Sequence, residues 1–191
     1  MQPDLIVANK EENVKEQVEI LAEEFPVWVT NVNNLEEAFN MMSDIGELTK
    51  TLNKAQQLIL NIKEEFSKLP TVINSKRACY LIWQKPFMTV GNDTLIHNMM
   101  QVAGLQNIFE DKIRYPEITL EEIKNNNCQL LILSSEPYPF KNRHILEIQQ
   151  HLPGTKIILV NGEMFSWYGS RLLLAAKYFN ENMSQWHLPI R

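Results

Sequence analysis

Three short segments of the chain carry an unusual share of its aromatic side chains. Residues 83–87, 134–140 and 161–171 hold 7 aromatic residues in 23 positions, although only 9% of the whole chain is aromatic. The seven are Trp83, Phe87, Tyr138, Phe140, Phe165, Trp167 and Tyr168. Aromatic rings offer a large contact area at low entropic cost, and Tyr and Trp keep a polar group for a hydrated ligand. We therefore expect a binding wall for a flat macrocycle or a catechol-like chelate; the alternative is that the rings seal the edge of the fold.

Charged residues in the same segments predict how a ligand or a partner protein is held. Lys85 and Arg171 are candidates for contact with an anionic ligand group, Arg171 through a bidentate contact, although a structural ion pair is an equal alternative for each. Glu136 stands before a stretch that Pro137 and Pro139 stiffen, so we expect its carboxylate to be held at a fixed angle. This suits docking on a partner, unless Glu136 only caps or solvates the loop.

No group of residues matches a catalytic arrangement, and we predict that the chain is not an enzyme. The glycines at 91 and 162 fit neither a phosphate-binding loop nor a dinucleotide-binding loop. Ser166 and Ser170 are not part of a Gly-x-Ser-x-Gly turn and lack a suitably placed histidine.

Metal ions, cofactors and nucleic acid are also not expected. The four histidines are scattered, with no pair four residues apart on an apolar-flanked helix. Cys79 and Cys128 each precede an apolar run, so we expect buried free thiols, although a bridge between them stays open. A net charge of -5 argues against a surface that tracks phosphates.

Five short apolar runs predict the strands that position these segments. They are residues 5–8, 27–29, 80–83, 130–133 and 157–160. Continuous rather than alternating apolarity is typical of parallel strands that are buried on both faces. The three aromatic segments follow the last three runs, and ligands of open α/β sheets lie beyond the carboxyl ends of the strands. The fold class is therefore α/β.

Helical patterns separate the runs and divide the chain. Residues 14–25 carry an amphipathic stripe, and residues 35–69 read as two helices broken near Gly46 and residues 49–51. We predict that residues 1–33 are the remnant of an N-terminal α/β lobe and that residues 34–70 are a helix pair including an interlobe helix. Residues 71–191 form a C-terminal α/β ligand-binding lobe, whose closing helix near residues 170–180 is apolar almost all round and should be sandwiched.

The first lobe is predicted to be incomplete. Two strands and one helix are too small to bury their own faces, so either this lobe has lost its beginning or another chain completes it. The second alternative predicts a possible homo-oligomer through the first lobe. No apolar run reaches the length of a membrane span, and the first ten residues do not have the pattern of a signal peptide.

Several stretches together resemble the helical-backbone class of ABC-transporter substrate-binding proteins, which includes cobalamin, haem and iron-siderophore receptors. The stretches are residues 3–13, 91–94, 115–122, 134–137 and 162–171, in family order. The resemblance implies two lobes joined by one long helix, here residues 52–69, with a metal chelate held in the cleft between them. It also implies that acidic residues contact a membrane permease, and Glu136 is the best match, followed by Glu163.

The resemblance also implies a periplasmic or membrane-surface location. Family members carry further strands, helices and an export signal before the position of Pro3, so we expect that this chain is N-terminally truncated. The competing hypothesis is a truncated non-transport paralogue that self-associates as an interaction protein.

Overall fold

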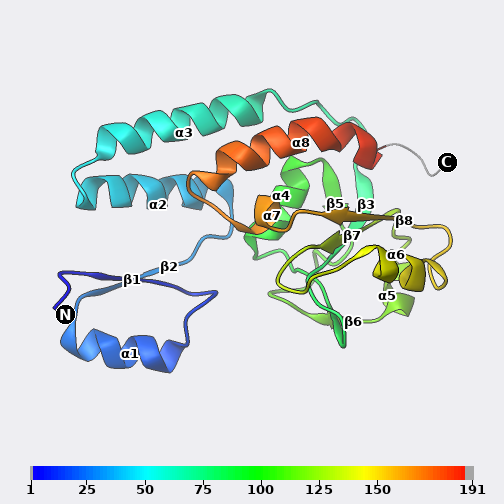
Figure 1. Ribbon diagram of the computed structural model, residues 1–191, viewed down its shortest axis with the longest axis horizontal. Coiled ribbons are helices and arrows are strands. Elements are labelled where there is room, and N and C mark those ends of the chain that lie inside the picture. The colour runs from blue at the N-terminus through cyan, green and yellow to red at the C-terminus, as the bar shows by residue number, and fades with distance from the viewer. Residues whose placement is uncertain (1, 188–191) are drawn as a thin grey trace.

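The computed structural model describes residues 2–187 and contains two α/β lobes and a helix pair (Figure 1). The predicted α/β class with parallel sheets is confirmed. The predicted boundaries at 33/34 and 70/71 fall in the connections before and after the helix pair.

The first lobe is a strand-helix-strand unit. Strands β1 (Ile6–Asn9) and β2 (Val27–Thr30) pair in parallel, with Ile6 opposite Val27 and Asn9 opposite Thr30. Helix α1 (Lys15–Glu24) connects them and has no buried residue. The lobe therefore has little core of its own.

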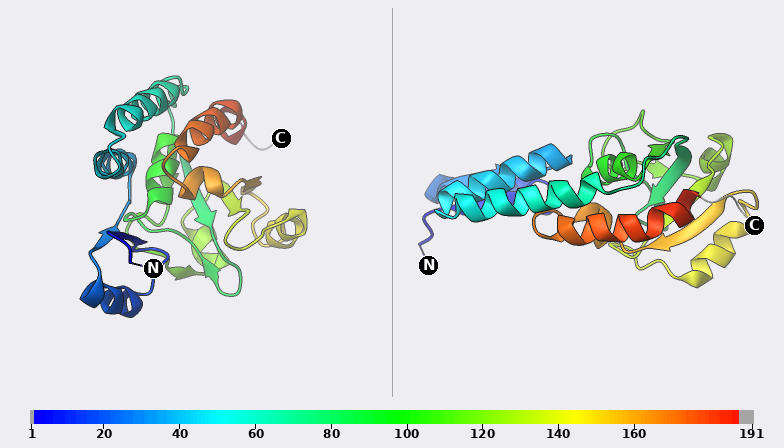
Figure 2. Two further views of the ribbon diagram at one scale, coloured as in Figure 1. Left: turned by 60° about the vertical axis from the view of Figure 1, so that its left-hand side comes forward. Right: turned by 90° about the horizontal axis from the view of Figure 1, so that it is seen from above.

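The helix pair consists of α2 (Leu35–Leu48) and α3 (Leu52–Ser67), which run antiparallel beside each other. The Asn34 side chain caps α2 by accepting a hydrogen bond from the Glu37 amide at 2.9 Å. A Cβ at Gly46 would lie 2.7 Å from the Cβ of Ala55, so glycine permits the close approach of the two helices. Figure 2 shows α3 lying along the closing helix α8 (Arg171–His187), which joins the pair to the second lobe.

The second lobe is built on a four-stranded parallel sheet with the order β5-β3-β7-β8. Its strands are β3 (Lys76–Leu81), β5 (Leu105–Asn107), β7 (Leu130–Ser134) and β8 (Lys156–Val160). Its other helices are α4 (Leu95–Val102), α5 (Leu120–Asn125), α6 (Asn142–Gln149) and α7 (Glu163–Ser166). Strands β4 (Phe87–Met88) and β6 (Glu117–Ile118) form a small antiparallel ribbon.

The third predicted strand needs a correction, because β3 begins at Lys76 and ends at Leu81 rather than spanning residues 80–83. The Ile82 amide donates to the Met88 carbonyl at 3.0 Å, so the chain turns toward β4 at this point. Trp83 consequently lies beyond the strand end, in an isolated antiparallel bridge to Met88 that precedes the turn at residues 84–86.

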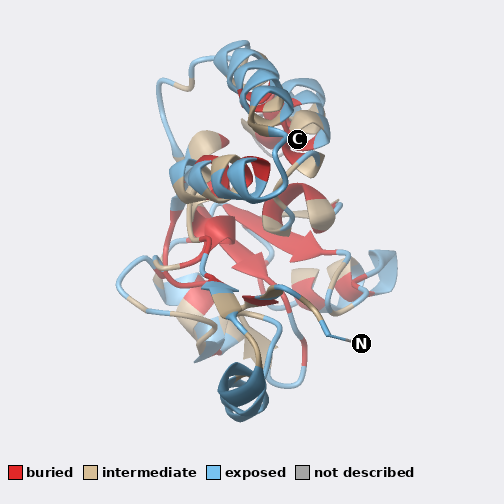
Figure 3. Ribbon diagram, turned by 90° about the vertical axis from the view of Figure 1, so that its left-hand side faces the viewer, coloured by how far each residue is buried: buried red, intermediate tan, exposed pale blue. Residues whose placement is uncertain are grey.

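Two groups of buried apolar side chains cover the sheet of the second lobe, and the first group continues into α2 and α3. Figure 3 shows strands of this sheet in the colour of buried residues. All five residues of β7 are buried. One face of α8 belongs to the first group, but Leu174 is 46% exposed and the opposite face carries further exposed residues, so α8 is an amphipathic surface helix and the predicted sandwiching is wrong. Cys79 and Cys128 are free and buried, as the sequence predicts, and burial raises the pKa of the Cys128 thiol to about 12. These thiols are therefore unreactive structural groups.

Candidate functional site

A cavity of about 820 Å³ lies between the two lobes, and we call it the cleft. The first lobe and the connection after it contribute Asn9, Glu11, Glu12 and Val32. The second lobe contributes Ile82, Trp83, Met88, Leu95, Ile96, Tyr115, Glu136, Pro137, Ser166, Trp167 and Tyr168. A cavity of this size, apolar with a few polar groups, is typical of small-molecule sites.

Three of the seven predicted aromatic residues line the cleft. Trp83 is 40% exposed and Trp167 is 51% exposed, and Tyr168 is half-buried beside Trp167. Each follows a strand of the second lobe, Trp83 after β3 and the other two after β8. The ends of these strands therefore bring together residues from distant parts of the sequence.

The other four aromatic residues lie elsewhere. Phe165 is 0% exposed and packs against the rings of Tyr80, Phe179 and Trp186. Phe140 is 5% exposed and belongs to the core on the other side of the sheet. Both rings fill the interior of the second lobe.

Tyr138 lies behind the cleft wall, between Trp83 and Phe140, with ring centroids 5.5 and 4.7 Å away. Its hydroxyl donates to the Gln84 Oε1 at 3.0 Å. Phe87 and Lys85 line a separate cavity of about 280 Å³ together with Glu147. The predicted wall thus divides into cleft residues, a supporting Tyr138, buried rings and a second cavity.

Glu136 faces the cleft. Its Oε1 accepts hydrogen bonds from the Trp167 Nε1 at 2.8 Å and the Ser166 Oγ at 3.1 Å. A Cβ at Gly162 would lie 2.6 Å from the Cγ of Glu136, so glycine is needed for this packing. The stiff loop therefore holds Glu136 against the turn after β8 and orients the Trp167 indole.

Glu163 and Arg171 form an ion pair beside the cleft, with 30% and 33% of their side chains exposed. The Arg171 guanidinium also lies 5.5 Å from the centre of the Trp167 ring. Arg171 therefore supports Trp167 from outside the cleft, in keeping with the ion-pair alternative left open by the sequence.

Polar contacts cross from the first lobe to the second at two places. The Glu11 carboxylate accepts from the Arg114 guanidinium at 2.7 Å and from the Tyr115 hydroxyl at 2.8 Å. The Asn9 side-chain amide donates to the Tyr168 hydroxyl. Burial raises the pKa of Tyr115, and its hydrogen bond to Glu11 raises it further. These contacts hold the β1–α1 loop against the second lobe.

Sequence reasoning did not identify the bridging residues as site residues. Glu11 and Tyr115 both lie in stretches that carried the family resemblance, and this was the available signal. Their pairing joins positions 104 residues apart. The periodicity of apolar residues predicts helices and strands but does not predict a contact between residues so far apart in the sequence.

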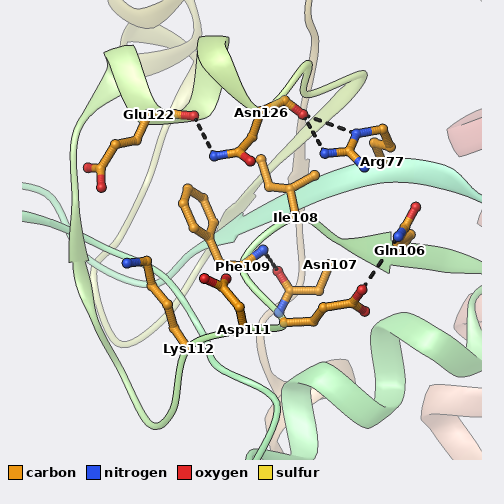
Figure 4. A pocket seen from close by; sticks show the side chains of 10 residues that line it. Arg77, Gln106, Asn107, Ile108, Phe109, Asp111, Lys112, Glu122 and Asn126 are labelled. Carbon is orange, nitrogen blue, oxygen red and sulfur yellow. Dashed lines mark hydrogen bonds between the residues drawn. The ribbon is translucent and has the colours of Figure 1, made fainter.

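A third, polar cavity of about 350 Å³ lies near α5 and β5 (Figure 4). The Arg77 guanidinium donates to the Asn126 carbonyl at 2.8 and 3.0 Å, and the Asn107 side chain accepts from the Phe109 amide. The Arg77, Asn107 and Asn126 groups of this cavity therefore already have partners.

Residues 2–187 contain neither a candidate metal-binding group nor a candidate membrane-spanning helix. No group of three or more histidine, cysteine or acidic side chains in that range is placed to hold a metal ion. No helix there has both the length and the apolarity for crossing a membrane.

Comparisons with known proteins give a consistent match. The profile of the periplasmic binding protein family matches residues 1–155. A vitamin B12-binding protein of Salmonella choleraesuis is 26% identical, with 97% of this chain and 71% of that protein covered. One from Pectobacterium carotovorum is 24% identical, with 93% of this chain and 66% of that protein covered.

Solved structures share the fold. A possible iron-binding periplasmic protein of Staphylococcus epidermidis has a TM-score of 0.75 at 20% identity, covering 95% of this chain and 76% of that one. The vitamin B12-binding protein BtuF of Vibrio cholerae has a TM-score of 0.72 at 16% identity, covering 96% and 74%. The heme-binding protein BhuT, solved with two hemes, has a TM-score of 0.77 at 14% identity, covering 96% and 75%.

Proposed function

Because the chain belongs to the periplasmic binding protein family, we propose that it is the substrate-binding component of an ABC importer for a metal chelate. Cobalamin, haem and ferric siderophores are the candidate classes, since relatives by sequence or fold are described as binding vitamin B12, heme or iron compounds. The observation that carries the proposal is the cleft of about 820 Å³ with two exposed tryptophans. The family consists of binding proteins, and no catalytic step is proposed.

Trp83, Trp167 and Tyr168 are the proposed ligand contacts. Large aromatic side chains left exposed inside a cavity are suited to covering the face of a macrocycle or an aromatic chelate. Tyr138 and Arg171 are proposed to position Trp83 and Trp167, because each packs against one of these rings. The fixed geometry lowers the entropic cost of binding.

Equilibrium dialysis tests this proposal with cyanocobalamin, haemin and a neutral ferric trihydroxamate. We expect at least one to bind with a dissociation constant below about 10 μM. Trp83→Leu should weaken that binding by about tenfold or more, because centrally placed aromatic contacts dominate binding energy.

Phe87→Leu is the matched control, since Phe87 follows the same strand but lines the separate cavity. Its affinity should stay within about twofold of the unsubstituted protein, as near-neutral contacts do. Failure of all three chelates to bind, or equal losses in both variants, would contradict the proposal.

Transport requires docking on a membrane permease, and we propose Glu163 as the second-lobe acid for this contact. Glu163 is partly exposed, whereas Glu136 is bonded to Ser166 and Trp167 within the cleft. The proposed location is the periplasm or the membrane surface, in line with the family. Glu163→Gln should reduce chelate uptake in cells that contain the permease, because it removes the docking charge. Its amide oxygen can still accept a hydrogen bond from Arg171, so chelate affinity should change by no more than about twofold. If uptake is unchanged, Glu136 becomes the candidate docking acid.

A second candidate function is self-association as an interaction protein. The observation that favours it is a set of exposed apolar side chains on the first lobe: Val7, Val14, Ile20, Leu21 and Val29. Sedimentation velocity distinguishes the two functions. A monomer at about 50 μM would contradict self-association, because apolar interfaces of standard size are stable at that concentration.

A further inference from the structure

Carboxylates gather at the first-lobe side of the cleft. Glu11 and Glu12 line the cavity, and Asp93 lies beside it, 4.0 Å from the Arg114 guanidinium. Arg114 also pairs with Glu11 at 2.7 Å. One guanidinium thus serves two carboxylates, while Glu12 is exposed in the same loop. Lys10 is exposed in the same loop, so three carboxylates face two cationic side chains and this side of the cleft carries a net negative charge.

Glu136 adds a carboxylate on the second-lobe side. Both of its side-chain hydrogen bonds come from neutral donors, the Ser166 hydroxyl and the Trp167 indole, and both fall on Oε1. Among the residues that the structure describes, no Lys, Arg or His lies within ion-pair distance of Glu136. Its charge is therefore held by hydrogen bonds and is not cancelled, and Oε2 is an acceptor for a donor on the ligand.

The cations that the sequence suggested for the ligand do not reach the cleft. Arg171 pairs with Glu163, and Lys85 lines the separate cavity with Glu147 and His151. Across residues 2–187, the cleft lining includes no Lys or Arg.

The geometry points to a cleft that selects by charge: it accepts neutral or cationic metal chelates and disfavours chelates with pendant carboxylates. A carboxylate on the ligand would lie between Glu136 and the Glu11–Glu12 loop and would be repelled by both. Because the cavity partly excludes water, this repulsion is screened less than at an open surface. A ligand amide or ammonium would instead find acceptors. This inference rests on the proposed function and narrows its substrate class.

Two matched pairs of chelates test charge selection. Cyanocobalamin is compared with its monocarboxylic acid, and ferrioxamine B, with its pendant ammonium, is compared with the N-succinyl derivative, which ends in a carboxylate. Dissociation constants are measured by equilibrium dialysis in about 20 mM and about 500 mM NaCl, because screening lengths differ several-fold between these conditions. In the pair that binds, we expect the dissociation constant of the carboxylate form to be at least about fivefold higher than that of its partner at low salt. This ratio of dissociation constants should be smaller at high salt.

Glu136→Gln should reduce the low-salt ratio by about half or more, because it removes one charge and keeps the shape. Glu147→Gln is the control, since it removes a carboxylate that lines the separate cavity, and it should leave the ratio unchanged. The change of this ratio with salt in the unsubstituted protein tests charge selection without any substitution.

The outcomes separate this inference from the proposed function. Equal or tighter binding of the carboxylate form, a ratio insensitive to salt, or binding of haemin with its two carboxylates in preference to both pairs would overturn charge selection alone. Absence of binding by every chelate would overturn the proposed function, and charge selection with it.

Discussion

The two lobes meet at one cleft but differ in how they are stabilised. Helix α1 of the first lobe has no buried residue, and Ile20 on it is 65% exposed. In the second lobe every residue of β7 is buried, and two groups of core side chains flank the sheet. Apolar burial is the main stabilising contribution to folding, so the second lobe supplies most of the stability.

The two lobes also contribute different kinds of side chain to the cleft. The second lobe presents the aromatic rings from strand ends that its core holds rigid. The first lobe contributes polar groups of the β1–α1 loop, held by hydrogen bonds and one ion pair to Arg114 and Tyr115. We therefore expect the first lobe to open at a lower free energy than the second.

A core substitution should show the largest contrast between the lobes. Phe165→Ala should lower the free energy of unfolding by about 3–5 kcal/mol, because Phe165 is fully buried and its ring packs against three others. Ile20→Ala in α1 should change it by no more than about 0.5 kcal/mol. Urea denaturation measures both, and similar losses would show that the first lobe has a core that the structure lacks.

Native-state hydrogen exchange should show the next largest contrast. Backbone amides of α1 should exchange through openings at least about 2 kcal/mol lower than those of β7, since few buried contacts resist the opening. Mass spectrometry of peptides covering residues 15–24 and 130–134 provides the comparison. Equal protection of the two segments would contradict the division into a self-supporting lobe and a dependent one.

The polar bridge between the lobes should have a smaller effect. Glu11→Ala removes the partner of Arg114 and Tyr115, and we expect it to lower the opening free energy of β1 by about 1–2 kcal/mol. Glu19→Ala is the control, because the exposed Lys15–Glu19 pair should contribute less than about 0.5 kcal/mol. If the two variants opened β1 equally, the Glu11 contacts would not be what holds the first lobe.

The smallest effect concerns the pH dependence of the second lobe. Burial lowers the pKa of His97 from its ordinary value of 6.5, and Asn107 lies 3.3 Å from its Nδ1. The folded state therefore binds this proton less readily than the unfolded state. The free energy of unfolding should be highest above pH 6.5 and should fall as the pH drops through that value toward the lower folded pKa.

His97→Gln should flatten this part of the pH profile in urea denaturation between pH 5 and 8. The nearby Glu110 opposes the shift, so the effect of His97 is modest. A profile that is identical in the variant, or one that rises toward low pH, would show that His97 is not buried in its neutral form.

The sequence predicted the fold class and the family well, because both depend on local signals. Continuous apolar runs indicated the parallel strands, and the residues after those strands included Trp83, Trp167 and Tyr168, which line the cleft. The family resemblance is confirmed by the match over residues 1–155.

The remaining features of the site depend on direction and on distant pairing. The local turn of the backbone decides whether a side chain after a strand points into the core or into the cleft. The sequence therefore did not distinguish Phe165, which lies in the core, from Trp167, which lies in the cleft. Likewise Arg171 is ion-paired with Glu163, although its position beside the aromatic segment suggested a ligand contact. The bridge from Glu11 to Tyr115 gave no local signal because its partners lie 104 residues apart.

The most direct test of a chelate in this cleft is a tryptophan fluorescence titration. The chain has four tryptophans, of which Trp83 and Trp167 line the cleft, whereas Trp186 is 4% exposed in the core and Trp28 lies on β2. With cyanocobalamin, haemin or a neutral ferric trihydroxamate as ligand, we predict saturable quenching that Trp28→Phe retains and that the Trp83→Phe, Trp167→Phe double variant largely loses. Absence of saturable quenching by all three chelates, or undiminished quenching in the double variant, would contradict ligand binding between the lobes.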